Sequence, residues 1–166
     1  MSGDRDALQR LKQIALFKEI SKNAEYMQKL TAICRTRSYK AGATIIKEGE
    51  IGSEMFVVLS GAVEILKRTR AGDNYTVVSL KAKDNVFFGE LALIDDDKRS
   101  ATVLAATDSE FLLISKKDFL ELGNSDPAIG LPITRAIAKI IASRLRKTTS
   151  DMLTIFDALV NEIQEE

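Results

Sequence analysis

The chain has 166 residues, and its 24 Lys and Arg balance its 24 Asp and Glu, so its formal net charge at pH 7 is zero. This length suits one domain with a helical extension, and a balanced charge gives no general attraction to nucleic acid or to an anionic membrane. The sequence contains no His, which removes Ser-His and Cys-His nucleophile pairs. Cys34 alone can form neither an intrachain disulfide nor a thiolate metal cluster. We therefore expect a protein that is not an enzyme and that holds no metal or prosthetic group.

The N-terminal stretch from Met1 to Gln13 is charged throughout and lacks the apolar core of a secretory signal. No run of the sequence approaches the roughly 18 apolar residues that a membrane span needs. A single free cysteine fits a reducing compartment. These features predict a cytoplasmic protein without a membrane partner.

Residues 1–36 have a pattern of apolar residues typical of helices. Between Asp4 and Cys34 the apolar residues recur at intervals of three and four, as at Leu8, Leu11, Ile14, Met27, Leu30 and Ile33. This spacing predicts two helices broken near Ser21. The Ser21 hydroxyl can satisfy a free amide of the first turn, so we expect it to cap the second helix.

Residues 37–118 have a pattern of residues typical of strands. Short β-branched and aromatic runs predict strands at Thr44–Lys47, Met55–Leu59, Ala62–Lys67, Tyr75–Leu80, Ser100–Ala106 and Glu110–Ile114. Ser60-Gly61 and Gly72-Asp73 lie where tight turns need positive φ. Many short strands at nearly even spacing favour an antiparallel sandwich or barrel.

Residues 119–166 are helical again. A long apolar stripe follows Pro132 and consists of Ile133, Ile137, Ile140, Ile141, Leu145, Met152, Ile155, Phe156, Leu159 and Ile163. It is too long to be covered by a small barrel, so we expect its later part to pair with a second copy, ahead of packing on the chain's own N-terminal helices. Thr148–Ser150 is a weak point where we expect a bend or a new helix. The acidic end, Glu162–Glu166, would repel DNA.

One segment, from Phe87 to Val103, carries charged groups in an unusual pattern. Gly89 followed by one helical turn leaves backbone amides free for an anion, and Glu90 begins that turn. Arg99 on the returning chain can face the same pocket with a planar fork suited to phosphate oxygens. A carboxylate would repel the phosphate unless the ligand also offers a hydroxyl, as a ribose beside a 3′,5′-cyclic phosphate does. The alternative is a Glu90–Arg99 ion pair that stabilises an empty loop.

The same segment resembles the phosphate-binding cassette of the cyclic-nucleotide-binding domain family, which includes catabolite activator proteins and regulatory subunits of protein kinase A. The similar residues are the Phe-Gly-Glu-Leu-Ala-Leu run at 88–93, followed by Arg-Ser-Ala at 99–101. The resemblance continues upstream at 16–21, 39–52 and 55–65, and it covers about residues 16 to 145.

The resemblance implies an α+β, mostly β fold: an antiparallel, jelly-roll-like β-roll of about eight strands, flanked by N-terminal helices and a long C-terminal helix. It implies that Glu90 accepts a bond from the ribose 2′-hydroxyl and that Arg99 pairs with the phosphate. The remaining ligand-binding positions that it implies are Phe88, Gly89, Leu91, Ala92, Ser100 and Ala101 in the cassette, Val77 or Val78 on the roll side of the base, and Arg144 over the base. Residues 1–36, 37–118 and 119–166 would then be the N-terminal helices, the roll, and the lid with its dimerisation helix.

Two departures from the family pattern bear on affinity. Lys98 stands where many relatives have Pro, and Asp95–Asp97 put negative charge near the anion site, where we expect a solvated turn. Ser100 does not settle the choice of nucleotide, and we favour cAMP over cGMP. The sequence thus predicts a cyclic-nucleotide sensor that moves its C-terminal helix and signals to an effector protein or to its own dimer. The alternative is a degenerate roll that binds no nucleotide and serves as a scaffold.

Overall fold

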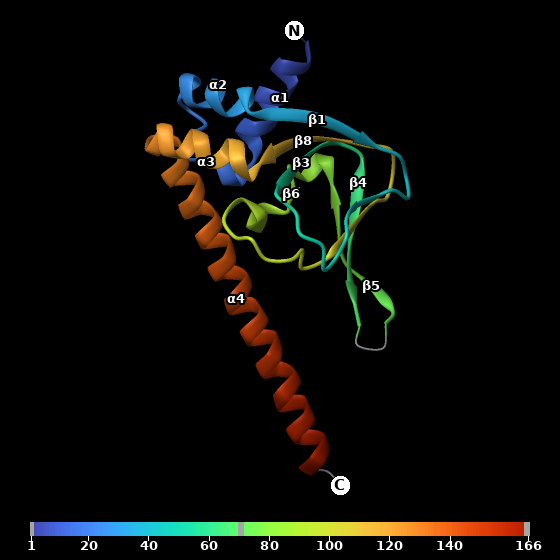
Figure 1. Cartoon of the computed structure of the whole chain (residues 1–166). Coiled ribbons are helices and arrows are strands. Elements are labelled where there is room, and N and C mark those ends of the chain that lie inside the picture. Colours follow the sequence, from blue (N-terminus) through green and yellow to red (C-terminus); the bar gives the residue numbers. More distant parts are fainter. Residues whose placement is uncertain (1, 70–71, 165–166) are drawn as a thin grey trace.

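The structure, a computed structural model, describes residues 2–69 and 72–164 and contains two four-stranded antiparallel sheets (Figure 1). The first sheet has the order β1-β8-β3-β6 and the second the order β2-β7-β4-β5. The strands are β1 Cys34–Tyr39, β2 Thr44–Ile46, β3 Glu54–Ser60, β4 Ala62–Arg68, β5 Asn74–Lys81, β6 Phe87–Phe88, β7 Thr102–Ala105 and β8 Ser109–Ser115. The described part of the chain is therefore the predicted β-roll, and the predicted fold class is confirmed.

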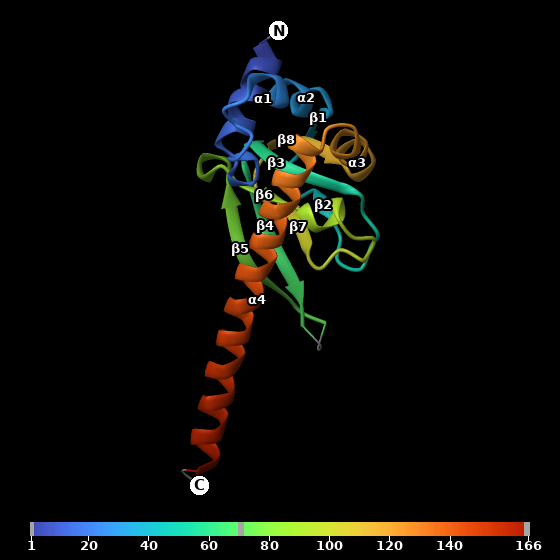
Figure 2. The same ribbon diagram turned by 90° about the vertical axis from the view of Figure 1, so that its left-hand side faces the viewer.

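Helices gather at one end of the roll (Figures 1 and 2). They are α1 Ser2–Gln13, α2 Ala24–Ala32, α3 Lys116–Ser125 and α4 Pro127–Gln164, and the short 3-10 helices are η1 Ala15–Phe17, η2 Ala82–Asp84 and η3 Glu90–Leu93. α4 starts at this end and runs past the roll well beyond it. Within residues 2–69 and 72–164, no helix combines the length and hydropathy needed to cross a bilayer.

Two buried clusters hold the elements together. One lies between the sheets, where the Phe56 and Phe88 rings stack with centroids 5.1 Å apart. The other lies between the first sheet and the helices and includes Val57, Ile114 and Ile133. Strand β3 is covered on both faces, so Met55 to Val58 are all buried and the strand reads as a continuous apolar run rather than an alternation.

Three local predictions are wrong. Asn23, not Ser21, caps α2: its Oδ1 accepts from the Tyr26 amide at 3.1 Å, while the Ser21 hydroxyl donates to the Lys18 carbonyl. The helix α4 runs without interruption through residues 148–150, where the Thr149 hydroxyl donates to the Leu145 carbonyl at 2.9 Å and so needs no other partner. Strand β7 begins at Thr102, two residues later than predicted.

The two strands absent from the prediction are β1 and β6. Strand β1 has the sequence CRTRSY and lies at a sheet edge, exposed over most of its length, so it carries no apolar period. Strand β6 has only two residues, too few to produce a pattern.

The long helix changes character along its length. Ile129, Ile133 and Ile137 are fully buried against the N-terminal helices and the roll. From Leu145 onward the large apolar side chains are exposed, and they are Leu145, Met152, Leu153, Ile155, Phe156, Leu159 and Ile163. The first half therefore packs on its own chain, whereas the second half lacks a cover. Glu165 and Glu166 of the predicted acidic end, like Met1, lie outside the described residues.

Candidate functional site

The loop that follows β6 has the predicted glycine turn. Gly89 adopts φ +76°, the left-handed region that glycine enters without steric cost, and η3 starts at the next residue. The Ala92 amide donates to the Gly89 carbonyl at 3.2 Å and closes the turn. The Ala92 amide, which the sequence predicts to be available to an anion, is therefore already hydrogen-bonded. The amides of Glu90 and Leu91 precede the first hydrogen bond of the turn.

Arg99 returns to this turn from the opposite side of the loop. Its amide donates to the Glu50 carbonyl at 2.8 Å, and its carbonyl accepts from the Gly49 amide at 2.9 Å. Its guanidinium then donates from Nη2 to the Glu54 carbonyl at 2.7 Å and from Nη1 to the Gly89 carbonyl at 3.4 Å. Backbone groups thus fix both ends of this residue, and the guanidinium keeps further N–H donors for another acceptor.

Two glycines leave room for the guanidinium. A Cβ at Gly52 would lie 2.2 Å from Nε of Arg99, and one at Gly89 would lie 2.9 Å from Nη1. Any side chain at Gly52 would therefore displace the arginine. Gly52 lies within the stretch 39–52 that resembles the family, but its role could not be predicted, because the close approach joins positions 47 residues apart in the chain.

The electrostatic surroundings of Arg99 combine burial with negative charge. Burial lowers the pKa of Arg99 below its ordinary value, and the charges of Glu54, Asp95 and Glu90 oppose this effect. The residue stays protonated, since an arginine guanidinium does not lose its proton in proteins. A half-buried cation whose hydration is reduced favours an anionic ligand, which would compensate for the lost water.

Glu90 is the one buried acid of the described residues, with 1% of its surface exposed. Its partner is not Arg99 but Arg144 of α4, whose Nη1 donates to Oε1 of Glu90. The alternative of a Glu90–Arg99 ion pair across an empty loop is therefore wrong. Arg144 thus links the long helix to the carboxylate of the turn.

The other predicted site residues are less closely associated. The Phe88 side chain is buried in the cluster between the sheets. Ser100 and Ala101 form a bend between Arg99 and β7. Val77 and Val78 lie on β5, the edge strand of the second sheet, and expose 51% and 40% of their surface.

The acidic stretch after the turn is exposed, as predicted for a solvated turn. The side chain of Asp96 is 94% exposed and pairs with Nζ of Lys116, the first residue of α3, at 2.6 Å. Lys116 also donates to the Asp95 carbonyl at 2.8 Å. This lysine therefore ties the loop to the helix that precedes α4.

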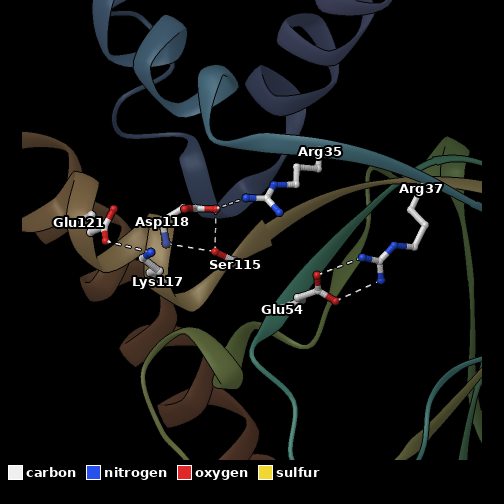
Figure 3. A network of polar contacts seen from close by, with 7 residues as sticks. All are labelled: Arg35, Arg37, Glu54, Ser115, Lys117, Asp118 and Glu121. Carbon is white, nitrogen blue, oxygen red and sulfur yellow. Dashed lines mark hydrogen bonds and ion pairs between the residues drawn. The ribbon is translucent and has the colours of Figure 1, made fainter.

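A set of ion pairs joins strand β1 to β3 and to α3 (Figure 3). Arg37 of β1 donates from both terminal nitrogens to the Glu54 carboxylate, each at 3.3 Å. Arg35 of the same strand lies 3.5 Å from Asp118, which also accepts from the Ser115 hydroxyl. Arg37 and Glu54 are functional candidates that sequence reasoning missed, because strand β1 is itself missing from the prediction.

The architecture is that of a β-roll domain with one charged loop site. A family model described as the cyclic nucleotide-binding domain matches residues 36–126, more than half of the chain. This chain belongs to the cyclic nucleotide-binding domain family.

Named relatives agree with this assignment. The chain is 29% identical over 128 residues to the cyclic AMP receptor protein of Thermus thermophilus, covering 76% of this chain and 56% of that protein. It is 35% identical over 122 residues to a cyclic nucleotide-gated potassium channel of Rhizobium etli, covering 74% of this chain and 32% of the channel. The chain therefore spans about half of the first relative and a third of the second.

Among solved structures, the N-terminal domain of a transcriptional regulator from Streptomyces coelicolor is similar, with a TM-score of 0.70 and 27% identity. The similarity covers 86% of this chain and 94% of that one. None of these three matches indicates a catalytic family.

Proposed function

We propose that this chain is a sensor domain for a 3′,5′-cyclic nucleotide, with cAMP favoured over cGMP. The observation that carries the proposal is the position of Arg99, whose guanidinium donates to the carbonyl of Gly89, the residue next to the buried Glu90. A guanidinium with donors to spare suits phosphate oxygens, and a buried carboxylate accepts a ribose hydroxyl. The name of the Thermus relative, a cyclic AMP receptor, supports the choice of cAMP.

In this proposal the ligand reaches the long helix through Glu90. The phosphate binds Arg99 and the free amides of the turn, while the ribose hydroxyl donates to a carboxylate that already accepts from Arg144 of α4. Ligand and helix then share one acceptor, so binding changes the free energy of the helix position. The result is a shift between two populations of α4.

The output partner in this proposal is a second copy of the chain or an effector protein that takes its place. Leu145, Met152 and Leu159 are exposed on α4 at intervals of seven residues, and Ile155 adds the intermediate position. This spacing is typical of a coiled-coil seam. A second α4 would cover the stripe that the chain's own roll leaves exposed.

The ligand proposal is tested by isothermal titration calorimetry with cAMP, cGMP and 5′-AMP. We expect both cyclic nucleotides to bind, cAMP more tightly, and 5′-AMP to bind poorly because its second phosphate charge and open ring do not fit one guanidinium. Arg99→Lys keeps the charge but loses the planar fork, so it should weaken cAMP binding by about tenfold or more. Lys98→Ala, a neighbouring exposed cation, is the matched control and should bind almost as wild type.

Two results would contradict the proposal. Equal affinity of wild type and Arg99→Lys would remove Arg99 from the site. The absence of binding by all three nucleotides, together with an unchanged thermal midpoint in their presence, would instead favour the degenerate scaffold, since a ligand of the native state must raise that midpoint.

A further inference from the structure

Glu54 accepts hydrogen bonds from two arginines, through its backbone carbonyl from one and through its side chain from the other. Its backbone carbonyl accepts from Nη2 of Arg99 at 2.7 Å and so helps to hold the phosphate-binding candidate. Its side-chain carboxylate accepts from both terminal nitrogens of Arg37, at 3.3 Å each (Figure 3). One residue at the start of β3 therefore connects two arginines, one through its main chain and one through its side chain.

The carboxylate of Glu54 is a potential competitor for the anion site. It belongs to the same residue whose carbonyl contacts the Arg99 guanidinium, and its charge acts on that guanidinium together with those of Asp95 and Glu90. Were this carboxylate to turn toward Arg99, it would occupy donors that a phosphate needs. In the structure it turns instead across β8 to Arg37 on the edge strand β1.

We propose that Arg37 and Glu54 are positioning residues that set the affinity of the anion site: Arg37 holds the Glu54 carboxylate away from Arg99. The inference rests on the proposed function, because it concerns the same phosphate. The Arg37 and Glu54 side chains are 48% and 32% exposed, so the effect is moderate in size. Tyr39 assists, since its hydroxyl lies 3.4 Å from Nη1 of Arg37.

The proposal predicts a particular coupling between two substitutions. Arg37→Ala leaves the Glu54 carboxylate without its partner and free to pair with Arg99, so cAMP should bind about two- to fivefold more weakly. Glu54→Gln removes the competing charge and should tighten binding slightly. In the double variant Arg37→Ala has no carboxylate left to release, so its affinity should equal that of Glu54→Gln alone.

The chain offers a matched control on the same strand. Arg35 is also exposed on β1, and its partner is Asp118 rather than a residue that contacts Arg99. Arg35→Ala changes the net charge by the same amount and should leave the affinity near that of wild type.

Calorimetric titration with cAMP of these five proteins gives the coupling. The proposal is overturned if Arg37→Ala weakens binding no more than Arg35→Ala does, or if it weakens binding equally with and without Glu54→Gln. Additive effects would mean that Arg37 acts only through its long-range charge or through stability.

A second measurement needs no nucleotide and separates this inference from the proposed function. The Nε–H resonance of Arg99 in a nitrogen-15 correlation spectrum is assigned by its loss in Arg99→Lys. Arg37→Ala should shift this resonance in the ligand-free protein, and the shift should vanish in the Glu54→Gln background. If wild type fails to bind cAMP, the proposed function is wrong while this spectrum still decides whether Arg37 controls Glu54; an unmoved resonance overturns the inference.

Discussion

The two charged groups of the site are held by different parts of the molecule. Arg99, which forms the phosphate end of the proposed site, is fixed by backbone carbonyls of the roll and lies against two glycines. Glu90, which forms the ribose end of the proposed site, is held by one side chain, Arg144, from a helix whose second half exposes its large apolar side chains. We therefore expect the phosphate end to be rigid and the ribose end, through the helix that holds it, to be movable.

The largest effect on the phosphate end is expected from a substitution at Gly52. The change Gly52→Ala places a Cβ against the guanidinium of Arg99, in the tightest approach made to this residue. We expect cAMP binding to weaken by about a hundredfold, or roughly 2.7 kcal/mol. Calorimetric titration measures the loss.

The matched control for this change is Gly42→Ala. A Cβ at Gly42 meets no atom within 4 Å, but its φ of +81° strains any other residue. It should cost about 1 kcal/mol of the free energy of unfolding and leave cAMP affinity unchanged. If Gly42→Ala weakened binding as much as Gly52→Ala, general destabilisation rather than displacement of Arg99 would be the cause.

The helix that holds the ribose end can be tested at its exposed apolar stripe, the proposed dimer seam. Leu159→Asp puts a charge into the proposed seam, where burying it without a partner costs about 2 kcal/mol or more. Light scattering with size-exclusion chromatography should show a dimer for wild type and a monomer for the variant.

The control for the seam is Thr154→Asp, on the same exposed half of α4, where the Thr154 hydroxyl donates to the Ser150 carbonyl. This variant should remain a dimer. A monomeric wild type across the accessible concentrations would instead assign the stripe to an effector protein.

In both regions the sequence predicted the features that depend on neighbouring residues. The turn at Gly89 and the return of Arg99 to it follow from local chemistry: glycine gives the positive φ, and both residues belong to the one segment from Phe87 to Val103. The stripe on α4 follows from helical periodicity, since Met152 and Leu159 repeat at seven residues. Both kinds of signal are local in sequence.

What the sequence could not predict joins distant positions. Gly52 matters because Arg99 passes over it, and Glu54 matters because Arg37 reaches it from an edge strand that has no apolar pattern. The Glu90–Arg144 contact joins a 3-10 turn to a helix 54 residues later. Each depends on the closure of the roll, which no pattern within a short window contains.

The link between the ribose end and helix α4 can be weakened at Arg144. Arg144→Gln leaves the buried Glu90 carboxylate without its cation, and because Arg144 is itself 58% exposed, water can replace part of the contact. We expect a loss of about 1–2 kcal/mol in the free energy of unfolding, measured by urea denaturation. The protection of α4 from hydrogen exchange should also stop responding to cAMP.

The control is Arg146→Gln, an exposed arginine two residues further along the same helix, which should change neither quantity. In the double variant Glu90→Gln and Arg144→Gln, most of the lost stability should return, because no buried charge remains. A stable Arg144→Gln protein whose helix still responds to cAMP would show that the ribose end signals by another contact.

The smallest effect is expected where the roll carries a charge pair remote from both ends. Nζ of Lys40 and the Ala41 amide both donate to Asp108, at 2.7 and 2.9 Å, and they hold the pKa of Asp108 below its ordinary value of 3.8. A carboxyl with a lowered pKa in the folded state stabilises the protein above its unfolded pKa, and this contribution is lost as the pH falls through the folded pKa. Asp108→Asn should therefore lower the thermal midpoint slightly at pH 7 and match wild type in acid below that range. Its affinity for cAMP should equal that of wild type, because rigidity at the phosphate end comes from the carbonyls and glycines around Arg99 rather than from surface ion pairs.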